Sequence, residues 1–382
     1  MNIVHAIETL DPSHGGPTLS VPSLAAAQAG LGHDVTLVAY AEADPQPLRD
    51  SLPGFDKVRI AGVPRGGYKE RLLASSAKQR FEEVTAGADV VHIHSLWRPF
   101  ALVAAQTSIR RGLKLVVAPR GMLNPWSLQQ RRLLKQLSLT LSWKRVLDAA
   151  FFIHALNDEE AQFMKPLELR SQVRVFPNGI FSQSFRQLPS AAQFRAKCGA
   201  LGDRPYLLFL GRLHHVKGLD YLLAAYAEYC RQDSRMDLVI AGPDGGMEPA
   251  LRRQVSELRL DSRVHLVGPL YGADKYSALA GATCFCLTSR QEGFSMAITE
   301  ALACGVPVVV SDQCHFPEIA TAGAGEVVPL DSNEIAAALL RLTSSTQRLR
   351  RASEAARSLV SRYDWSAIAS DVVGSYNTAA AV

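Results

Sequence analysis

Short apolar runs alternate with amphipathic or Ala-rich stretches along the chain of 382 residues. The apolar runs that favour strands are 3–7, 34–39, 58–60, 90–94, 114–118, 151–154, 173–176, 206–210, 236–241, 264–267, 284–287, 308–311 and 326–328. The stretches that favour helices are 20–31, 99–111, 218–232, 247–258, 275–280, 295–303 and 333–343. Strands that alternate with helices in this way predict an α/β protein with parallel sheets.

The alternation occurs in two halves that a polar, mixed stretch around 181–204 separates. We therefore expect two Rossmann-like, doubly wound parallel-sheet domains, residues 1–182 and 183–363, which face a cleft. Ligands of such sheets bind beyond the carboxyl ends of the strands. The helical segment 364–382 follows the last strand, and we expect it to pack back on the first domain.

Composition is that of a soluble globular protein with a large core, because 47% of the residues are hydrophobic and 20% are charged. The six cysteines are scattered through the second half, which favours buried thiols in a reducing compartment. No run of 18 apolar residues occurs, and the first residues lack a basic region and a cleavage site. These features predict a cytoplasmic protein.

The excess of positive charge lies in the first half of the chain. Residues 1–180 hold 21 Lys and Arg against 16 Asp and Glu, whereas residues 181–382 hold 20 of each kind. Between Asp89 and Asp148 there are ten basic residues and no acidic one. Segment 131–147 reads as a basic amphipathic helix, either lying on an anionic membrane surface or forming an ordinary solvated face. Nucleic acid is not expected, because no aromatic residues interleave with the basic ones.

Two loops carry the chemistry of an anion site. The strand 206–210 leads into Gly211-Arg212 and then Lys217-Gly218, which places two cations beyond a strand end. Arginine offers a planar fork to phosphate oxygens and lysine a mobile point charge. Two solvated basic residues on a loop are the alternative.

The strand 284–287 leads into Glu292-Gly293-Phe294-Ser295 and an Ala-rich helix that contains Glu300. We expect Ser295 to cap this helix, whose first N–H groups suit a phosphate or a sugar hydroxyl. Glu292 and Glu300 stand eight positions apart and can bracket a ligand, since carboxylates accept hydrogen bonds from vicinal hydroxyls. A capped surface helix with incidental acids is the alternative.

Together these motifs resemble those of the retaining glycosyltransferases of family 4, which have the GT-B fold. The resemblance covers nearly the whole chain. Its most specific part is the pair of glutamates, and three further motifs support it: Gly211-Arg212 with Lys217-Gly218, Phe176-Pro177-Asn178-Gly179, and Gly15-Gly16.

The resemblance implies a role for each matching residue. Arg212 and Lys217 would hold the diphosphate of a nucleotide-sugar donor, and Glu300 would hold its ribose. The transferred sugar would contact Glu292 and the backbone of Gly293, Phe294 and Ser295. The donor phosphates would also meet Gly15 and Gly16, and the base would lie near Gly242, Val267 and Leu270. No metal and no cofactor besides the nucleotide-diphosphate sugar is expected, since no cluster with metal-ligand spacing lies near these loops.

The acceptor would bind to the first domain. Many relatives place a histidine after the strand that corresponds to 114–118, where this chain has Pro119-Arg120. His94, at the end of the strand 90–94, is the alternative polar group, and we count it with Glu292, Arg212 and Lys217 among the candidate catalytic residues. His94, Trp97 and Arg120 are the candidate acceptor-binding residues.

The resemblance implies transfer of a hexose to a glycan or lipid-linked acceptor with retention of anomeric configuration. Synthesis of exopolysaccharide, lipopolysaccharide or O-antigen, at the inner face of the membrane, is the expected setting. The alternatives are a sugar-nucleotide epimerase or phosphorylase and a non-catalytic protein that binds a sugar nucleotide.

Overall fold

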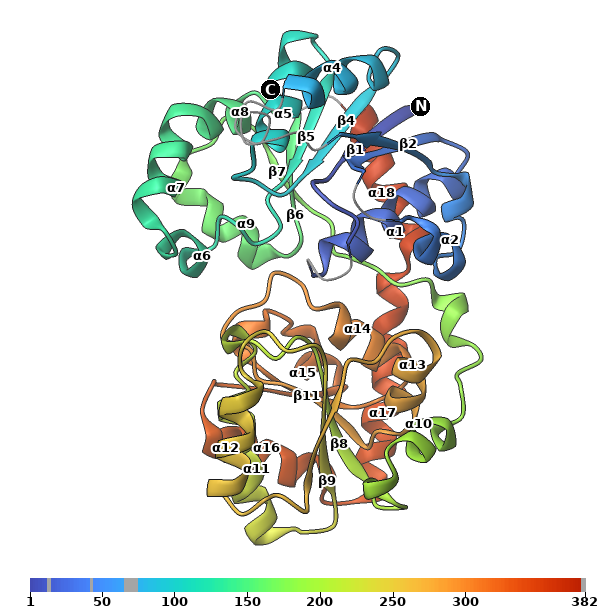
Figure 1. The fold of residues 1–382 in the computed structure, drawn as a ribbon, viewed down its shortest axis with the longest axis vertical. Coiled ribbons are helices and arrows are strands. Elements are labelled where there is room, and N and C mark those ends of the chain that lie inside the picture. The colour runs from blue at the N-terminus through green and yellow to red at the C-terminus, as the bar shows by residue number, and fades with distance from the viewer. Residues whose placement is uncertain (12–14, 42–43, 65–74, 379–382) are drawn as a thin grey trace. The chain divides into compact units, whose positions relative to one another are not determined.

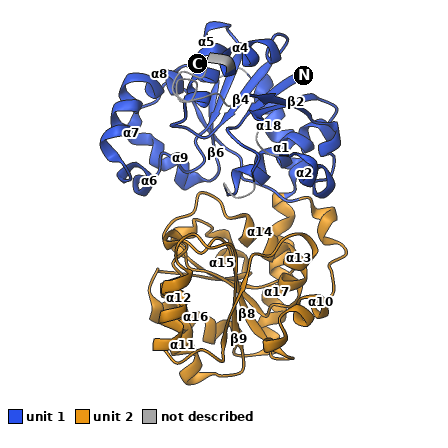
Figure 2. Ribbon diagram, in the orientation of Figure 1, with its two compact units in different colours: residues 1–180, 364–382 blue, residues 181–363 orange. Residues whose placement is uncertain are grey.

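A computed structural model describes residues 1–11, 15–41, 44–64 and 75–378 (Figure 1). The chain forms two compact units (Figure 2). The first unit contains Met1–Ile180 and Asp364–Val382, and the second contains Phe181–Tyr363. Each unit is built around its own parallel sheet, as the alternation of strands and helices predicts.

The first unit has a seven-stranded sheet in the order β3-β2-β1-β4-β5-β6-β7, in which all neighbours are parallel. Its strands are β1 (Asn2–Ala6), β2 (Asp34–Tyr40), β3 (Arg59–Val63), β4 (Val90–His94), β5 (Lys114–Ala118), β6 (Phe152–Ala155) and β7 (Val173–Val175). Its helices are α1 (Pro17–Gly30), α2 (Gln46–Ser51), α4 (Ser75–Val84), α5 (Pro99–Arg110), α6 (Pro125–Gln129), α7 (Arg132–Ser138), α8 (Lys144–Asp148), α9 (Asp158–Met164) and α18 (Trp365–Asn377).

Two segments of this unit bear on the expectations above. The predicted basic helix 131–147 is formed by α7 and α8, which a π-helical turn, Leu139–Trp143, connects. The C-terminal segment forms α18, which packs against α1 within the first unit (Figure 1). The last residues of that predicted segment, 379–382, lie outside the described residues.

The second unit has a six-stranded parallel sheet in the order β10-β9-β8-β11-β12-β13. Its strands are β8 (Tyr206–Leu210), β9 (Asp237–Ala241), β10 (Val264–Gly268), β11 (Cys284–Leu287), β12 (Val308–Ser311) and β13 (Gly325–Val328). Its helices are α10 (Ala191–Lys197), α11 (Leu219–Gln232), α12 (Glu248–Glu257), α13 (Gly272–Gly281), α14 (Met296–Ala303), α15 (Glu318–Ala322), α16 (Ser332–Thr343) and α17 (Thr346–Val360).

The central strands are buried along their whole length. Every residue of β4, β9, β11 and β12 is buried, which explains why these strands read as continuous apolar runs rather than as alternating ones. Three residues of these strands are buried although they are polar: His92 and His94 in β4, and Asp237 at the start of β9. Each of these buried polar groups therefore needs partners inside the protein.

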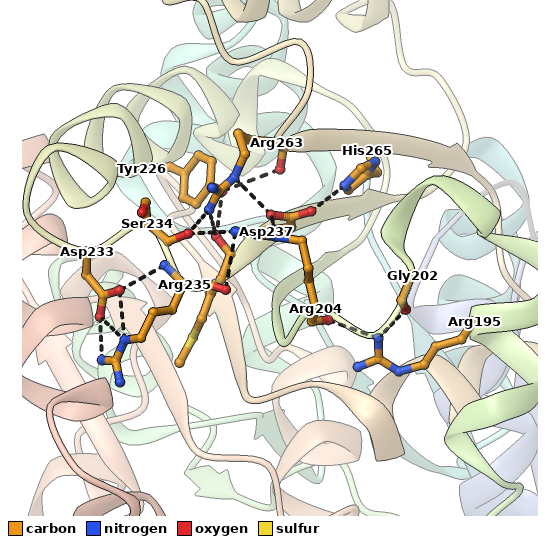
Figure 3. A network of polar contacts seen from close by, with 11 residues as sticks. Arg195, Gly202, Arg204, Tyr226, Asp233, Ser234, Arg235, Asp237, Arg263 and His265 are labelled. Atoms are coloured by element: carbon orange, nitrogen blue, oxygen red, sulfur yellow. Dashed lines mark hydrogen bonds and ion pairs between the residues drawn. The ribbon is translucent and has the colours of Figure 1, made fainter.

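Asp237 finds its partners at the amino-end edge of the second sheet (Figure 3). Its Oδ1 lies 2.9 Å from Nε of Arg204 and 2.9 Å from Nε of Arg263, and its Oδ2 lies 2.9 Å from Nε2 of His265. Arg204 precedes β8, Arg263 precedes β10, and His265 lies on β10. This network ties three neighbouring strands together at the edge opposite to the loops that carry the predicted site.

Candidate active site

In the second unit, the loops that follow β8, β11 and β12 are joined by hydrogen bonds. Oγ1 of Thr288 donates to the carbonyl oxygen of Gly218 at 2.8 Å. The backbone N–H of Arg290 donates to the carbonyl oxygen of Val216 at 2.7 Å. The N–H of Glu292 donates to the carbonyl oxygen of Gln313 at 3.0 Å. The three loops therefore hold their side chains in fixed relation.

Gly218 is required where the first two loops meet. Its φ is +62°, and a Cβ atom there would lie 1.9 Å from the carbonyl oxygen of Thr288. Any side chain would push the two loops apart and strain the backbone. The glycine after Lys217 thus explains how the loop after β8 approaches the loop after β11.

This approach brings Lys217 and Glu292 into contact. Nζ of Lys217 lies 2.6 Å from Oε1 of Glu292, which also accepts a hydrogen bond of 2.5 Å from Oγ of Ser289. The side chains are 24% and 10% exposed, so the ion pair is partly shielded from water. The structure thus unites one predicted cation with one predicted carboxylate.

The remaining predicted charges have other surroundings. Oε1 of Glu300, which lies inside α14, accepts a hydrogen bond of 2.7 Å from Nζ of Lys275 on α13. Burial alone would lower the pKa of Lys275, but the charges of Glu300 and Tyr276 and the hydrogen bonds to both together outweigh it and raise that pKa above its ordinary value. The side chain of Arg212 is exposed and forms no hydrogen bond or ion pair with the rest of the described chain.

Arg290 anchors the loop after β11, a role that our sequence reasoning missed. Its Nη1 and Nη2 donate to the two carboxylate oxygens of Asp220 at 2.8 and 2.6 Å, and its guanidinium lies over the ring of Tyr221. Burial would raise the pKa of Asp220, but the hydrogen bonds and charge of Arg290 lower it. Lys275 was missed as well, because no local motif links a residue of α13 to one of α14.

One prediction about this unit is wrong. Ser295 stands at the N-cap position of α14, but its side chain makes no capping hydrogen bond. Its carbonyl oxygen accepts from Thr299 instead, through both the N–H and the hydroxyl. The residue preceding Ser295, Phe294, packs its ring near the rings of Phe316 and Tyr363. The first N–H groups of α14 therefore carry no side-chain cap.

The residues predicted near the base lie at the carboxyl ends of β9 and β10. Gly242 follows β9 directly, and its N–H donates to the carbonyl oxygen of Gly268 at 2.8 Å. Val267 lies on β10, and Leu270 follows two residues after its end. Both side chains are partly buried. The contact between Gly242 and Gly268 is made by backbone groups, which leave little side-chain signature in the sequence.

In the first unit, Arg120 and His94 are in direct contact. Nε and Nη2 of Arg120 lie 3.2 and 3.1 Å from Nδ1 of His94. Nη1 donates to Oγ of Ser20 at 3.1 Å and to Oδ1 of Asn178 at 3.0 Å. Asn178, part of the motif Phe176-Pro177-Asn178-Gly179, is thus a buried hydrogen-bond partner of Arg120.

The guanidinium of Arg120 lacks a salt-bridge partner. The three side chains that it contacts, His94, Ser20 and Asn178, are neutral, and Arg120 forms no ion pair with a described residue. Burial lowers the pKa of Arg120 to about 10, so it is charged at neutral pH. Nearby, Glu160 accepts hydrogen bonds from the N–H groups of Gly121 and Leu156, which hold the loop after β5. An unpaired, partly buried cation is a candidate anion-binding group.

Trp97, Gly15 and Gly16 complete the predicted set. Trp97 packs edge-on against Trp143, with the ring centroids 6.4 Å apart, and its buried Nε1 has no hydrogen-bond partner among the described residues. Gly15 and Gly16 are exposed and directly precede α1. The contact between Arg120 and Ser20 places Arg120 near the first turn of that helix.

The chain matches two family descriptions that together span both units. Residues 15–179 match the "Glycosyl transferase 4-like domain", and residues 190–359 match "Glycosyl transferases group 1". Among curated proteins, the chain is 29% identical to a phosphatidyl-myo-inositol mannosyltransferase of Mycobacterium leprae, over 96% of this chain and 94% of that protein. It is 27% identical to a GDP-mannose:cellobiosyl-diphosphopolyprenol alpha-mannosyltransferase of Xanthomonas oryzae pv. oryzae, over 99% and 97% of the two chains.

Solved structures share the fold at lower identity. A sucrose-phosphate synthase from Thermosynechococcus elongatus aligns with a TM-score of 0.76 at 21% identity, over 98% of both chains. HepE of Anabaena, in complex with UDP-glucose, aligns with a TM-score of 0.76 at 20% identity, again over 98% of both. With both domains matched, the chain belongs to the group 1 glycosyltransferases of family 4, which have the GT-B fold and transfer a sugar from a nucleotide sugar.

Proposed function

We propose that the protein is a retaining, metal-independent hexosyltransferase that extends a lipid-linked glycan. The observation that carries this proposal is the contact between Lys217 and Glu292, which lies four residues before the uncapped start of α14. Arg212, in the same loop as Lys217, has no ion-pair partner among the described residues. We further propose mannose as the hexose, because the two curated relatives named above are mannosyltransferases. The same names suggest a lipid-linked acceptor.

On the donor side, charge develops on the diphosphate as the bond between the anomeric carbon and the phosphate oxygen breaks. Arg212 and Lys217 supply positive charge, and the free N–H groups at the start of α14 add their partial positive charge. Glu300 holds the ribose hydroxyls, and Glu292 binds the transferred sugar. The acceptor hydroxyl attacks from the face that the diphosphate leaves, and its proton passes to the departing phosphate oxygen.

On the acceptor side, we assign Arg120 to the phosphate that links glycan and lipid. Its guanidinium lacks a carboxylate partner in the described chain, and arginine suits phosphate oxygens. His94 is the last residue of β4, and Trp97 follows three residues later. Both shape the same side of the site. The setting that we propose is synthesis of exopolysaccharide, lipopolysaccharide or O-antigen.

The test is a transfer assay with GDP-mannose, UDP-glucose and other nucleotide sugars, each with a polyprenyl-diphosphate glycan. We expect one donor to give a glycan longer by one hexose, unchanged in rate by EDTA, with the anomeric configuration of the donor in the product. If the protein epimerises the donor when no acceptor is present, it is a sugar-nucleotide epimerase instead. Tight nucleotide-sugar binding with no product on any acceptor would instead indicate a non-catalytic binding protein.

We also propose that the first unit binds an anionic membrane surface peripherally, at the inner face. No helix in the described part of the chain is long and apolar enough to cross a membrane. However, Leu133, Leu134, Leu137 and Leu141 on α7 and the π-helical turn are 57–81% exposed. Arg131, Arg132 and Arg145 flank them and are exposed too. Exposed leucines beside arginines match the interfacial zone of an anionic bilayer.

Liposome flotation tests the membrane proposal. We expect recovery with anionic vesicles to exceed recovery with neutral ones, and to fall at least fivefold when Leu133, Leu137 and Leu141 are all replaced by Gln. The matched control is Leu31→Gln, which changes an exposed leucine after α1. Equal recovery in neutral and anionic vesicles would contradict the proposal.

A further inference from the structure

A continuous chain of hydrogen bonds runs through the interior of the first unit, from Arg120 to the carbonyl oxygen of Phe176. We call it the histidine chain. In order, its links join Arg120 to His94, His94 to His5, His5 to Gln28, Gln28 to Tyr376, Tyr376 to His92, His92 to His154, and His154 to Phe176. Its members come from β1, β4, β6, α1 and α18.

The two ends of the histidine chain determine where its protons lie. A guanidinium only donates, so Nδ1 of His94 accepts and its Nε2 carries the proton. That proton is donated to Nδ1 of His5 at 2.9 Å, and Nε2 of His5 donates to Oε1 of Gln28 at 2.6 Å. Nε2 of Gln28 then donates to the hydroxyl of Tyr376 at 3.2 Å.

The Phe176 end of the histidine chain fixes the protons of His154 and His92 in the same way. A carbonyl oxygen only accepts, so Nε2 of His154 donates to Phe176 at 2.7 Å and its Nδ1 accepts. Nε2 of His92 therefore donates to Nδ1 of His154 at 3.2 Å, and the Tyr376 hydroxyl donates to Nδ1 of His92 at 2.8 Å. At Tyr376 the hydroxyl oxygen accepts from Gln28 and its proton is donated to His92. Every hydrogen bond of the histidine chain therefore runs in the same direction, from Arg120 to Phe176.

Neutral histidines satisfy every link. All four are at most 2% exposed, and burial lowers the pKa of His5 to about 4 and that of His154 to about 3. Burial also places the pKa values of His92 and His94 well below the ordinary value, with the charge of Arg120 as a further cause. With each ring neutral and protonated at Nε2, no donor faces a donor along the chain.

We propose that the histidine chain is a positioning device: it holds His94 as the Nε2–H tautomer, so that Nδ1 is always free to accept from Arg120 and to orient its guanidinium. His94 is then a positioning residue, because its two ring nitrogens are both engaged within the protein. This inference rests on the proposed role of Arg120 in substrate binding. It assigns function to His5, Gln28, His92, His154 and Tyr376, which no sequence motif marked.

A metal ion is the competing explanation for so many histidines. The ligand atoms of His5, His92 and His94 lie within 4.8 Å of one another. However, each of their six ring nitrogens already has a hydrogen-bond partner. A metal ion held by all three rings would displace at least two of these bonds. Stoichiometric zinc in the purified full-length protein, lost in His5→Asn, would overturn the proposal.

The tautomers can be measured directly by long-range ¹H–¹⁵N correlation NMR of the full-length protein at pH 7, with assignments from single His→Asn variants. We expect His5, His92, His94 and His154 all to be neutral and protonated at Nε2. A ring protonated at Nδ1, or doubly protonated, would overturn the proposal. This measurement needs no substrate, so it stands even if the transfer assay identifies no donor.

The functional test compares two replacements of His5. Asparagine can place an acceptor oxygen near the position of Nδ1, whereas leucine cannot. We expect His5→Leu to lower kcat/KM at least tenfold and His5→Asn to stay within about threefold of wild type. Equal losses in the two variants would show that His5 matters only for packing and would overturn the proposal.

A double variant shows whether His5 acts through Arg120. If it does, His5→Leu with Arg120→Ala is no slower than Arg120→Ala alone, because the group that His5 positions is already gone. Independent losses that multiply would overturn the proposal. Thermal unfolding of each variant identifies loss of fold. If His5→Leu does not fold, the pair His94→Leu and His94→Asn, of which only the second retains an acceptor near Nδ1, replaces the two His5 variants.

Discussion

Nζ of Lys217 lies 2.6 Å from Oε1 of Glu292, and this ion pair joins the loop after β8 to the loop after β11. The ammonium group of Lys217 is thus paired with a carboxylate. A diphosphate that binds Lys217 must therefore compete with Glu292 for it. The pair is a side-chain contact between two loops that other hydrogen bonds hold in place.

This competition predicts opposite effects on binding and on turnover. Glu292→Gln frees Lys217, so we expect the nucleoside diphosphate product to bind threefold to tenfold more tightly by calorimetry. If Glu292 binds the transferred sugar as proposed, we expect kcat to fall at least a hundredfold, because the sugar loses a charged hydrogen-bond acceptor. Glu257→Gln, on the exposed end of α12, is the control. Weaker binding of the diphosphate would contradict this account of the pair.

The contact between Lys275 and Glu300 predicts strong coupling in stability. Both side chains are largely buried, so removing one partner leaves the other without compensation. We expect a double-mutant cycle with Lys275→Met and Glu300→Gln to give a coupling free energy of about 1–3 kcal/mol in urea unfolding. The pair Arg231 and Glu228, whose arginine is mostly exposed, should give about 0.2–0.5 kcal/mol. Similar values for both cycles would refute this prediction.

The close approach at Gly218 predicts that even a methyl group there is damaging. In Gly218→Ala the new Cβ meets the Thr288 carbonyl oxygen, so we expect a loss of more than about 2 kcal/mol of stability and a marked fall in kcat. Gly323→Ala is matched in backbone conformation, since its φ is +72°, but it has open space around Cβ. It should lose only about 1 kcal/mol. Equal losses would mean that backbone strain alone explains Gly218.

The buried histidines predict that stability falls as the pH is lowered. Between pH 6.5 and 4 the unfolded chain binds protons at His5 that the folded chain does not, so the free energy of unfolding decreases with decreasing pH. From pH 7 to pH 5 one such histidine accounts for about 2 kcal/mol. Between pH 7 and pH 5, the free energy of unfolding measured in urea should therefore fall by about 2 kcal/mol less in His154→Gln than in wild type. Equal pH dependence in both proteins would show that His154 is not held neutral.

Much of the fold could be predicted because parallel strands covered on both faces are continuous apolar runs. Strands β4, β5, β8, β11 and β12 have the bounds that the apolar pattern predicts. The meeting of Lys217 and Glu292 was foreseeable for a related reason, since loops at the carboxyl ends of neighbouring strands lie at one edge of a sheet. Local pattern and sheet geometry were sufficient there.

What escaped prediction are contacts between residues that no local rule links. Lys275 and Glu300 stand on different helices, and Arg290 reaches Asp220 across 70 positions of sequence. Ser295 occupies the position expected of a cap, yet its side chain makes no capping bond. His92 and His94 could be read as two inward-facing residues of one strand, but nothing in the sequence indicates that Tyr376 completes their hydrogen bonds.

Helix α18 also has a consequence for synthesis on the ribosome. It carries Tyr376 into the interior of the first unit, although residues 181–363 of the second unit are translated before it. The first unit therefore emerges from the exit tunnel with His92 and Gln28 lacking the hydroxyl that joins them. Its nascent form therefore stays incompletely assembled until α18 has been translated and has left the tunnel.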